Sequence, residues 1–369
     1  MSQLVEVKKY AYIDALRGIA VLGTLLIHCS KYEYGINNFG DFFKDFFQLG
    51  NSGVQLFFMM SAFTLYMSMS QKKGLEKNTY FNFFVRRIFR ILPLFYFSVI
   101  IYFFIQNGNY WWLKYPNIDS FSLLISTLTF TNGFHPIWIN SIVEGGWSIA
   151  IEMIFYALFP LIFKYIKSLK RAMFFLIISL FISSLSYLIM IKYPLIEQDG
   201  LWKGFYYFNF LAQLPIFILG ILIYLIINQK GRFTEWVSDI QIPIILFAFY
   251  LISNLLFNHI QNHILIAFSM FIVVLTFTSK KNKLFINKVT CFLGKISYSM
   301  YLTHFPVLFI MWKLNLIDVF KGQIINFGLR FLILIVLTSL VSYITYRLIE
   351  LPGVNLGKKI IVYFENKRK

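Results

Sequence analysis

Apolar stretches long enough to cross a lipid bilayer recur along the whole of this 369-residue chain. A helix needs about 20 predominantly apolar residues to cross about 30 Å of hydrocarbon. The pattern therefore predicts an all-α, polytopic transmembrane helical bundle of about ten spanning helices. We place the spans near residues 11–30, 52–70, 88–106, 147–166, 172–191, 204–227, 241–257, 263–279, 296–312 and 324–346.

One further apolar segment, "FSLLISTLTFTNGF" at 121–134, is too short to be counted as a full span. Counting it as one would also place the basic segment 164–171 on the opposite side of the membrane from the other basic segments. We interpret 121–134 as a re-entrant or interfacial segment. The chain is then a single integral-membrane domain over residues 1–369, with short tails outside spans that run from 11 to 346.

The composition excludes a soluble globular protein. Hydrophobic residues make up 58% of the chain and charged residues only 14%, whereas a soluble domain has about 25% charged residues. The net charge of +18 would suit nucleic-acid binding, but most basic residues fall on the side of the predicted membrane that holds the N-terminus. This is the positive-inside distribution. We therefore expect both termini in the cytoplasm and no nucleic-acid partner.

The first span, within "YIDALRGIAVLGTLLIHCSK", carries three ionisable side chains. Arg17 and His28 are eleven residues apart, so they share one helix face about 16 Å apart along the axis. Asp14 lies three residues before Arg17, where it can pair with it. Because such groups are costly in lipid, we expect this face to line the bundle interior or a hydrated cavity. The alternatives are a structural Asp–Arg pair with His28 at the far interface, and a cleaved signal peptide, which the interrupting charges disfavour.

Polar side chains also interrupt three later spans. Glu152 and Tyr156 lie four residues apart in "GGWSIAIEMIFYALFP", and Arg330 lies in the last span. In "GKISYSMYLTHFPVLFI" a polar stripe at i, i+4 and i+7 consists of Ser297, Tyr301 and His304. Buried charges normally pair, so we expect Glu152 to pair with Arg330 or with His28. Hydrogen bonding between helices is the alternative, but four spans with such residues favour a shared cavity.

Three arginines, Arg86, Arg87 and Arg90, lie just before Pro93 in "FVRRIFRILPLFYF". They are either a positive-inside stop at an anionic leaflet or a group of guanidiniums that binds phosphate bidentately. The first interpretation predicts that mutating them changes only the topology, and the second that it weakens ligand binding.

Neither the cysteines nor the histidines form a recognisable disulfide or metal pattern. Cys29 and Cys291 fall on opposite sides of the predicted membrane, so they are not expected to pair. His259 and His263 are four residues apart, as in some zinc sites, but their segment supplies no third ligand. We therefore expect no metal.

Taken together, these motifs resemble membrane-bound acyltransferase family 3, the O-acetylases of O-antigen, exopolysaccharide and related glycans. The matching segments follow in order from residue 14 to residue 352: "DALRGIAVLGTLLIH", "SGVQLFFMMSAFTLY", "RRIFRILPLFYF", "GGWSIAIEMIFYALFP", "LAQLPIFILGILIY", "GKISYSMYLTHFPV" and "YRLIELP". The Arg-x10-His motif falls on Arg17 and His28, Arg-x-x-Arg on Arg87 and Arg90, Trp-Ser…Glu…Phe-Tyr on Trp147, Ser148, Glu152, Phe155 and Tyr156, and Ser-Tyr-x-x-Tyr-Leu-x-His on Ser297, Tyr298, Tyr301 and His304.

The chain departs from the family pattern at two places. The usual Ser-Gly-Phe of the second span is Ser61-Ala62-Phe63, and the usual Glu-Arg-Pro near the end is Glu350-Leu351-Pro352. We interpret both as packing changes, although the second removes a basic group that could contact phosphate. The family often carries a fused extracytoplasmic esterase-like domain, for which this chain has no room. We therefore expect the membrane domain or a partner protein to handle the acceptor.

The resemblance implies a reaction and roles for these residues. Acetyl-CoA would donate an acetyl or other small acyl group to a hydroxyl of a cell-surface or lipid-linked glycan, such as lipopolysaccharide or exopolysaccharide, at the bacterial inner membrane. We assign His28 as the general base and Glu152 as the group that orients it, with a covalent acetyl-His28 left open. Arg86, Arg87, Arg90 and Arg17 would bind the nucleotide phosphates, and Arg17 is also assigned to the catalytic residues together with His28 and Glu152. The candidates for contacts with the substrate or the oxyanion are Trp147, Ser148, Tyr156, Ser297, Tyr301, His304 and Arg330.

Two other classes of protein would accept similar residues. A transporter or flippase for a lipid-linked sugar also uses ionisable groups inside the membrane, and it predicts substrate movement without acetyl-CoA. A non-catalytic sensor or scaffold would leave the arginine cluster without a ligand. Labelled acetyl-CoA separates all three, because only an acyltransferase passes the label to a glycan.

Overall fold

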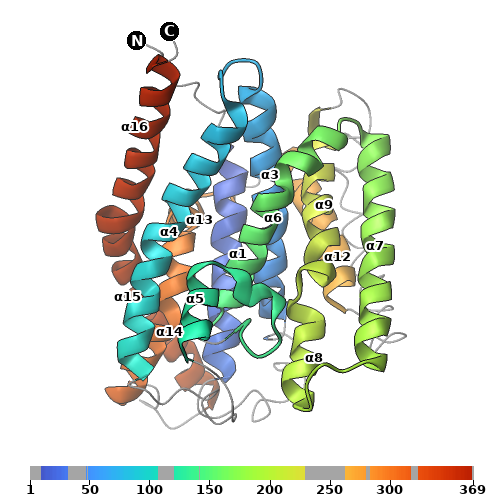
Figure 1. Ribbon diagram of the computed structural model, residues 1–369. Helices are drawn as coiled ribbons and strands as arrows, with labels where there is room; N and C mark the ends of the chain where they lie inside the picture. The colour runs from blue at the N-terminus through green and yellow to red at the C-terminus, as the bar shows by residue number, and fades with distance from the viewer. Residues whose placement is uncertain are drawn as a thin grey trace. The chain divides into compact units, whose positions relative to one another are not determined.

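The computed structural model describes residues 10–31, 47, 49–106, 120–140, 142–228, 262–279, 283–316 and 323–367, and the regular structure in them is helical (Figure 1). The chain forms two compact units. Unit 1 consists of Met1–Val54, Glu76–Gly108 and Leu284–Lys369, and unit 2 of Gln55–Leu75 and Asn109–Lys283. The all-α prediction is therefore confirmed.

Six helices in the described part of the chain are long and apolar enough to cross a membrane. They are Ala11–Lys31, Thr79–Ile105, Gly146–Tyr165, Leu169–Lys192, Asp199–Asn228 and Ile325–Lys367. Each covers one of the predicted spans, so the chain is an integral membrane protein. Predicted spans 52–70, 263–279 and 296–312 are helical without being among the six, and 241–257 lies outside the described residues. The count of about ten stays a prediction.

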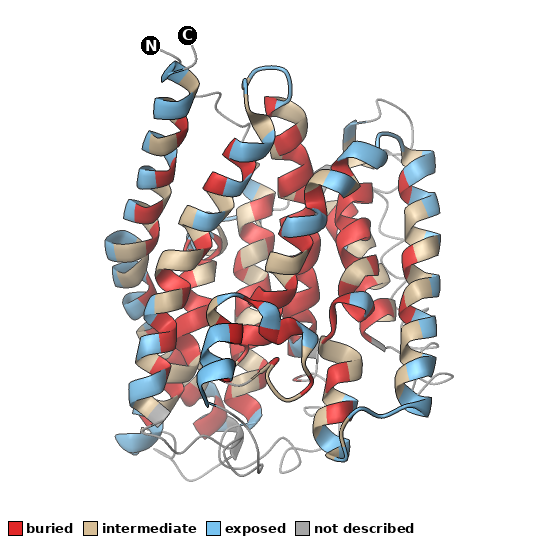
Figure 2. Cartoon of the chain, viewed as in Figure 1, coloured by how far each residue is buried: buried red, intermediate tan, exposed pale blue. Residues whose placement is uncertain are grey.

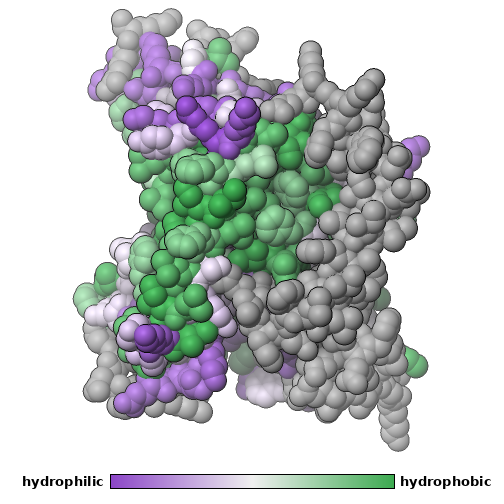
Figure 3. All heavy atoms as spheres, turned by 90° about the vertical axis from the view of Figure 1, so that its right-hand side faces the viewer, coloured by the Kyte–Doolittle hydropathy of each residue, from purple (hydrophilic) through white to green (hydrophobic). Residues whose placement is uncertain are grey.

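The long helix Leu169–Lys192, α7, shows why the chain needs a membrane. Only 11% of its most apolar window is buried within the protein, and Figure 2 shows exposed and half-exposed residues along its length. Apolar residues form a broad surface in Figure 3, with hydrophilic residues gathered above and below it. Such a surface is stable only against lipid.

Unit 1 contains the first span and the whole C-terminal part of the fold. Its elements are α1 (Ala11–Lys31), η2 (Leu49–Ser52), α4 (Thr79–Gln106), α13 (Lys288–Lys295), α14 (Ser297–Lys313), α15 (Gln323–Thr345), the π-helical segment η5 (Tyr346–Glu350) and α16 (Leu351–Lys367). The sequence pattern indicated only a tail after residue 346, but the helix continues through η5 into α16. This extension packs on α4, where Gly353 lets the backbone approach Phe89 and Pro93.

Two glycines bring α1 and α13 into backbone contact. A Cβ atom added to Gly18 would overlap the carbonyl oxygen of Thr290, and one added to Gly294 would overlap the carbonyl oxygen of Asp14. Small residues commonly allow such close approach between membrane helices, where packing replaces the hydrophobic effect as the driving force. The contact fixes the position of α1 against α13 along its axis.

Unit 2 is built around α9, which lies within the sixth predicted span and contacts α6, α7, α8 and α12. Its elements are α3 (Gly53–Lys72, which begins in unit 1), α5 (Ser120–Leu128), η4 (Thr131–Phe134), α6 (Gly146–Tyr165), α7, α8 (Asp199–Phe208), α9 (Phe210–Asn228) and α12 (Asn262–Ser279). Buried Ser179 and Ser183 on α7 allow close packing on α9. Phe217 of α9 stacks on Phe155 of α6 at 4.1 Å between ring centroids.

The segment predicted as re-entrant or interfacial, 121–134, forms two short helices. The nine residues of α5 cover about 14 Å at 1.5 Å per residue, which is less than half of a bilayer. Phe130, between α5 and η4, has a left-handed backbone with φ 61° that ends the first helix. The segment therefore does not form a span of its own.

The predicted span 204–227 is interrupted at Asn209. This residue has an extended backbone, with φ −65° and ψ 157°, and it separates α8 from α9. Its side chain accepts the Ala212 N–H at 3.0 Å and donates to the Phe205 carbonyl at 2.8 Å. Asn209 thus caps both helix ends, which compensates the backbone groups that the break leaves without helical partners.

We predict that Gly294→Ala lowers the free energy of unfolding by about 1–3 kcal/mol, since the added methyl group must push apart two packed backbones. Thermal unfolding of the purified protein in detergent measures the effect. Gly328→Ala is the matched control, because nothing lies within 4 Å of its added Cβ atom. An unchanged melting temperature for Gly294→Ala would contradict the α1–α13 contact.

Candidate active site

The two histidines of the predicted cavity meet in unit 1. His28 of α1 and His304 of α14 lie with their ring centroids 5.2 Å apart and their planes tilted by 37°. Both rings contact Phe305, at 4.4 Å from His28 and 4.3 Å from His304. His304 is fully buried and His28 is half-buried. The fold therefore brings together two residues 276 positions apart in the sequence, and the shared cavity of four spans stays a prediction.

The hydrogen bonds of His304 determine which ring nitrogen carries its proton. Nδ1 lies 2.7 Å from the carbonyl oxygen of Tyr301 and 3.3 Å from that of Met300. A carbonyl oxygen only accepts, so Nδ1 carries the hydrogen and Nε2 of the neutral ring carries a lone pair. Nε2 is buried and has no hydrogen-bond partner among the described residues. A neutral His304 is thus an acceptor at Nε2, which disfavours its predicted role as a donor to an oxyanion.

The other members of the polar stripe on α14 are also buried. Ser297 and Tyr301 are 4% and 7% exposed, and the Tyr301 ring lies 5.8 Å from that of His304. The neighbouring Tyr298 donates its hydroxyl to the Ile91 carbonyl at 2.8 Å, which ties α14 to α4. The stripe faces protein rather than lipid.

Arg330 of α15 is a buried guanidinium beside the first span. Its side chain is 3% exposed, contacts the thiol of Cys29 and lies 5.7 Å from the centre of the Phe327 ring. Nε has no hydrogen-bond partner among the described residues. Because Cys29 directly follows His28, Arg330 reaches α1 next to the histidine pair. An ionisable group kept in such a place at a cost of several kcal/mol is a candidate functional residue.

Glu350 is a central polar residue whose importance the sequence pattern did not indicate. It is 3% exposed, accepts a hydrogen bond from the Ser299 hydroxyl at 2.9 Å and interacts electrostatically with Arg90 and Arg17. It also lies in the π-helical segment, a distortion that often marks functional sites. We had interpreted the Glu350-Leu351-Pro352 segment as a packing change. The signal that could have identified Glu350 is an acidic residue in a helix that faces arginines on two other spans.

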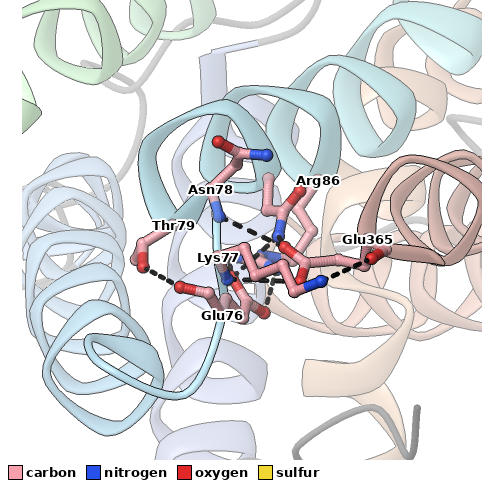
Figure 4. Close-up of polar contacts among 7 residues, drawn as sticks. Glu76, Lys77, Asn78, Thr79, Arg86 and Glu365 are labelled. Atoms are coloured by element: carbon pink, nitrogen blue, oxygen red, sulfur yellow. Dashed lines mark hydrogen bonds and ion pairs between the residues drawn. The ribbon is translucent and has the colours of Figure 1, made fainter. Parts of the chain in front are cut away.

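Arg86 is engaged in an ion pair at the start of α4. Its Nη1 and Nη2 donate to the two carboxylate oxygens of Glu76 at 2.7 and 3.1 Å (Figure 4). The two side chains are only 15% and 7% exposed. Arg86 was expected to bind phosphate together with Arg87 and Arg90, and that assignment stays a prediction. The geometry gives Arg86 a partner within the protein.

The same corner holds the end of α16. Glu365 accepts the backbone N–H groups of Lys77 and Asn78, both at 3.2 Å, and the Asn82 amide at 2.8 Å (Figure 4). Lys77 and Asn78 directly precede α4, and an anion is favoured there because the positive end of the helix dipole lies at the N-terminus. Glu365 thereby fixes α16 against the beginning of α4.

In unit 2, Glu152 is held by two hydroxyl groups. Ser61 of α3 and Tyr156 of α6 both hydrogen-bond to Glu152 Oε1, and their own oxygens lie 3.2 Å apart. Ser61 belongs to the segment that departs from the family pattern. The pairing expected between Glu152 and Arg330 or His28 joins residues of two different units and stays a prediction.

Trp147 and Ser148 begin α6 just before Glu152. The Trp147 ring contacts Phe58 edge-on at 5.9 Å and lies 5.5 Å from the Tyr207 ring. Ser148 donates its hydroxyl to the Gly145 carbonyl at 3.1 Å, in the turn that starts the helix. In that turn, burial raises the pKa of the Glu144 carboxyl. Trp147 and Ser148 therefore fix the start of α6. Trp147 is almost fully buried.

The described residues contain no group of three or more side chains suited to hold a metal. Of the histidine pair considered for zinc, His259 lies outside the described residues, and His263 donates Nε2–H to the Ala212 carbonyl at 3.1 Å. Cys29 and Cys291 are both free thiols. Cys291 contacts the Ala11 carbonyl at one end of α1, whereas Cys29 lies near the other end.

Residues 10–347 match the acyltransferase domain of acyltransferase family 3, and the chain belongs to this family. It is similar to the O-acetyltransferase OatA of Staphylococcus aureus (strain NCTC 8325 / PS 47), with 24% identity over 395 residues, 96% of this chain and 59% of that protein. It is also similar to the putative O-acetyltransferase SACOL0978 of Staphylococcus aureus (strain COL), with 26% identity over 386 residues and the same two shares. The chain thus spans less than two thirds of these relatives. No solved structure matches it.

We predict that Arg86→Gln lowers the free energy of unfolding by about 2 kcal/mol, since it leaves the nearly buried Glu76 carboxylate without its cation. Glu76→Gln should have a similar effect, and the double variant should lose less than the sum of the two. Melting temperatures in detergent measure all three. Lys203→Gln removes the exposed Lys203–Asp199 pair and should leave the melting temperature unchanged. Additive effects of Arg86→Gln and Glu76→Gln would contradict the ion pair.

Proposed function

We propose that this acyltransferase moves an acetyl or other small acyl group from cytoplasmic acetyl-CoA to a hydroxyl of a cell-surface or lipid-linked glycan. Membership of acyltransferase family 3 and the similarity to proteins named O-acetyltransferase support the reaction class. The observation that carries the proposal is the contact between His28 and His304 inside a membrane domain. An imidazole buried in a membrane domain is costly as a structural group and useful as a base.

His28 is the general base of the proposed reaction. One ring nitrogen takes the proton of the acceptor hydroxyl while the oxygen forms a bond to the acyl carbon. The C–S bond of the thioester then breaks, and the thiolate leaves with the electron pair. Because a thiol has a pKa of about 8.5, the thiolate needs little help to leave and afterwards takes the proton from His28. A covalent acetyl-His28 is the second route, and the same positions serve it.

Arg330 is the best donor for the oxyanion in this proposal. During the reaction the carbonyl oxygen of the acyl group becomes negative, and fixed donors in a dry site stabilise it strongly. The Arg330 guanidinium is buried near Cys29, and its Nε–H has no partner among the described residues. Tyr301 could supply a second donor. Removing either group should therefore slow the chemical step more than it weakens substrate binding.

The phosphates of acetyl-CoA are assigned to Arg87, Arg90 and Arg17. A guanidinium binds phosphate through two parallel hydrogen bonds. Glu350 lies within electrostatic range of Arg90 and Arg17, so it can hold both guanidiniums in place before the donor binds. Arg86, paired with Glu76, would support α4 instead. We assign contacts with the acceptor to Trp147 and Ser148, and the role expected of Glu152 in orienting His28 stays a prediction.

We predict that His28→Ala abolishes glycan acetylation while the protein remains in the membrane at its normal abundance. Membranes incubated with labelled acetyl-CoA, followed by isolation of polysaccharide and lipid-linked sugars, measure the transfer. The control is His263→Ala, which removes another buried histidine that the reaction does not use. Full transfer in the His28→Ala membranes would overturn the role of His28. Sugar movement without any label transfer by the unmodified protein would instead identify a transporter.

We predict that Arg90→Gln raises the KM for acetyl-CoA by about tenfold or more, since each charge-assisted hydrogen bond contributes about 1.5–3 kcal/mol. Arg87→Gln should act in the same direction. Initial transfer rates at several donor concentrations measure the KM. Arg171→Gln is the matched control, because Arg171 is an exposed arginine that donates to the Tyr165 carbonyl at 3.3 Å. A KM unaffected by both Arg87→Gln and Arg90→Gln would place the phosphates elsewhere.

A further inference from the structure

A buried acceptor atom remains unexplained in the histidine pair. His304 Nε2 carries a lone pair, because Nδ1–H is used by the Tyr301 carbonyl at 2.7 Å. The side chain is completely buried, and Nε2 has no hydrogen-bond partner among the described residues. An unsatisfied buried polar atom costs about 1–3 kcal/mol. The fold keeps this acceptor in place, with its tautomer fixed by the backbone.

His28 is the polar ring that packs against this acceptor. The two ring centroids lie 5.2 Å apart, and Phe305 contacts both rings and limits their movement. This centroid separation is short enough for two imidazoles to hydrogen-bond when a nitrogen of each faces the other, and such a bond requires His28 to turn into that orientation. Hydrogen bonds of catalytic groups are often long before the substrate binds and shorten in the reacting complex. His28 is half-buried and can contact a substrate, whereas His304 cannot.

We propose that His304 is the positioning residue for His28, and this rests on the proposed function. When His28 takes the hydroxyl proton, its ring becomes an imidazolium with two N–H groups. One N–H faces the substrate and later returns its proton to the thiolate. The other donates a hydrogen bond to His304 Nε2, with no second proton transferred. His304 thus does what a carboxylate does in a catalytic triad, while remaining neutral.

Two features of the pair favour this role over simple core packing. A buried polar atom normally has a hydrogen-bond partner, whereas His304 Nε2 has none among the described residues. The backbone carbonyls of Tyr301 and Met300 complete the arrangement, since they hold His304 in the one tautomer that presents an acceptor.

Two substitutions at position 304 separate the roles of its two nitrogens. In His304→Asn the amide N–H replaces Nδ1–H toward the Tyr301 carbonyl, but no acceptor remains near the Nε2 position. In His304→Gln the longer side chain can place its amide oxygen near that position. We expect kcat for acetyl transfer to fall by about 100-fold in His304→Asn, as for the loss of general base assistance. His304→Gln should recover at least tenfold of that loss, and the KM for acetyl-CoA should stay unchanged in both.

The assay uses the full chain in membranes, labelled acetyl-CoA and equal amounts of each variant by immunoblot. His263→Asn and His263→Gln form the control pair and should not differ from each other. Equal activity of the Asn and Gln variants at position 304, or normal kcat in His304→Asn, would overturn the positioning role. If His28→Ala is inactive in that case, the proposed function survives and only this inference fails. If His28→Ala is active, the proposed function fails first.

Discussion

The cost of burying ionisable side chains in a membrane domain governs this structure. Hydrocarbon does not solvate a guanidinium, a carboxylate or a protonated imidazole, so each must find partners on other helices. Unit 1 meets this requirement with residues distant in sequence: Glu350 with Ser299 and Arg90, and His28 with His304. Such partners converge only if the helices that carry them are held in a fixed register. The glycine contacts between α1 and α13 and the continuous helix from α15 to α16 supply that register.

The polar groups are distributed along α1 in a way that suits group transfer. Arg17 is associated with Glu350 near the beginning of the helix, and His28 is paired with His304 near its other end. The first environment is rich in positive charge and suits a phosphorylated donor, whereas the second is neutral and aromatic and suits a reacting acyl group. In the proposed reaction, one helix would separate recognition of the donor from chemistry on its acyl group. An acyltransferase needs both functions, and the chain belongs to acyltransferase family 3.

Local patterns predicted the helices and the residues that face inward, but not their partners. The spacing of Arg17 and His28 placed both on one face of a helix, and the stripe on α14 correctly indicated buried polar positions. Glu350 was missed because its importance depends on arginines from two other helices, which no local pattern reveals. Arg86 belonged to a cluster that looked uniform in sequence, yet one carboxylate, Glu76, distinguishes it from its neighbours. The pairing of Glu152 across the two units stays a prediction.

The close packing of α1 has a consequence for the choice of donor. Arg17 and His28 lie on one continuous helix, so its rise fixes their separation at about 16 Å, and the contact through Gly18 and Gly294 fixes the register of that helix against α13. If phosphate binds at Arg17 and the acyl carbon must reach His28, the donor must be long enough to span the distance between these two residues. An acyl phosphate, with one oxygen between its two groups, is far too short. In the proposed reaction, this distance favours a donor with a long, thin arm, such as acetyl-CoA.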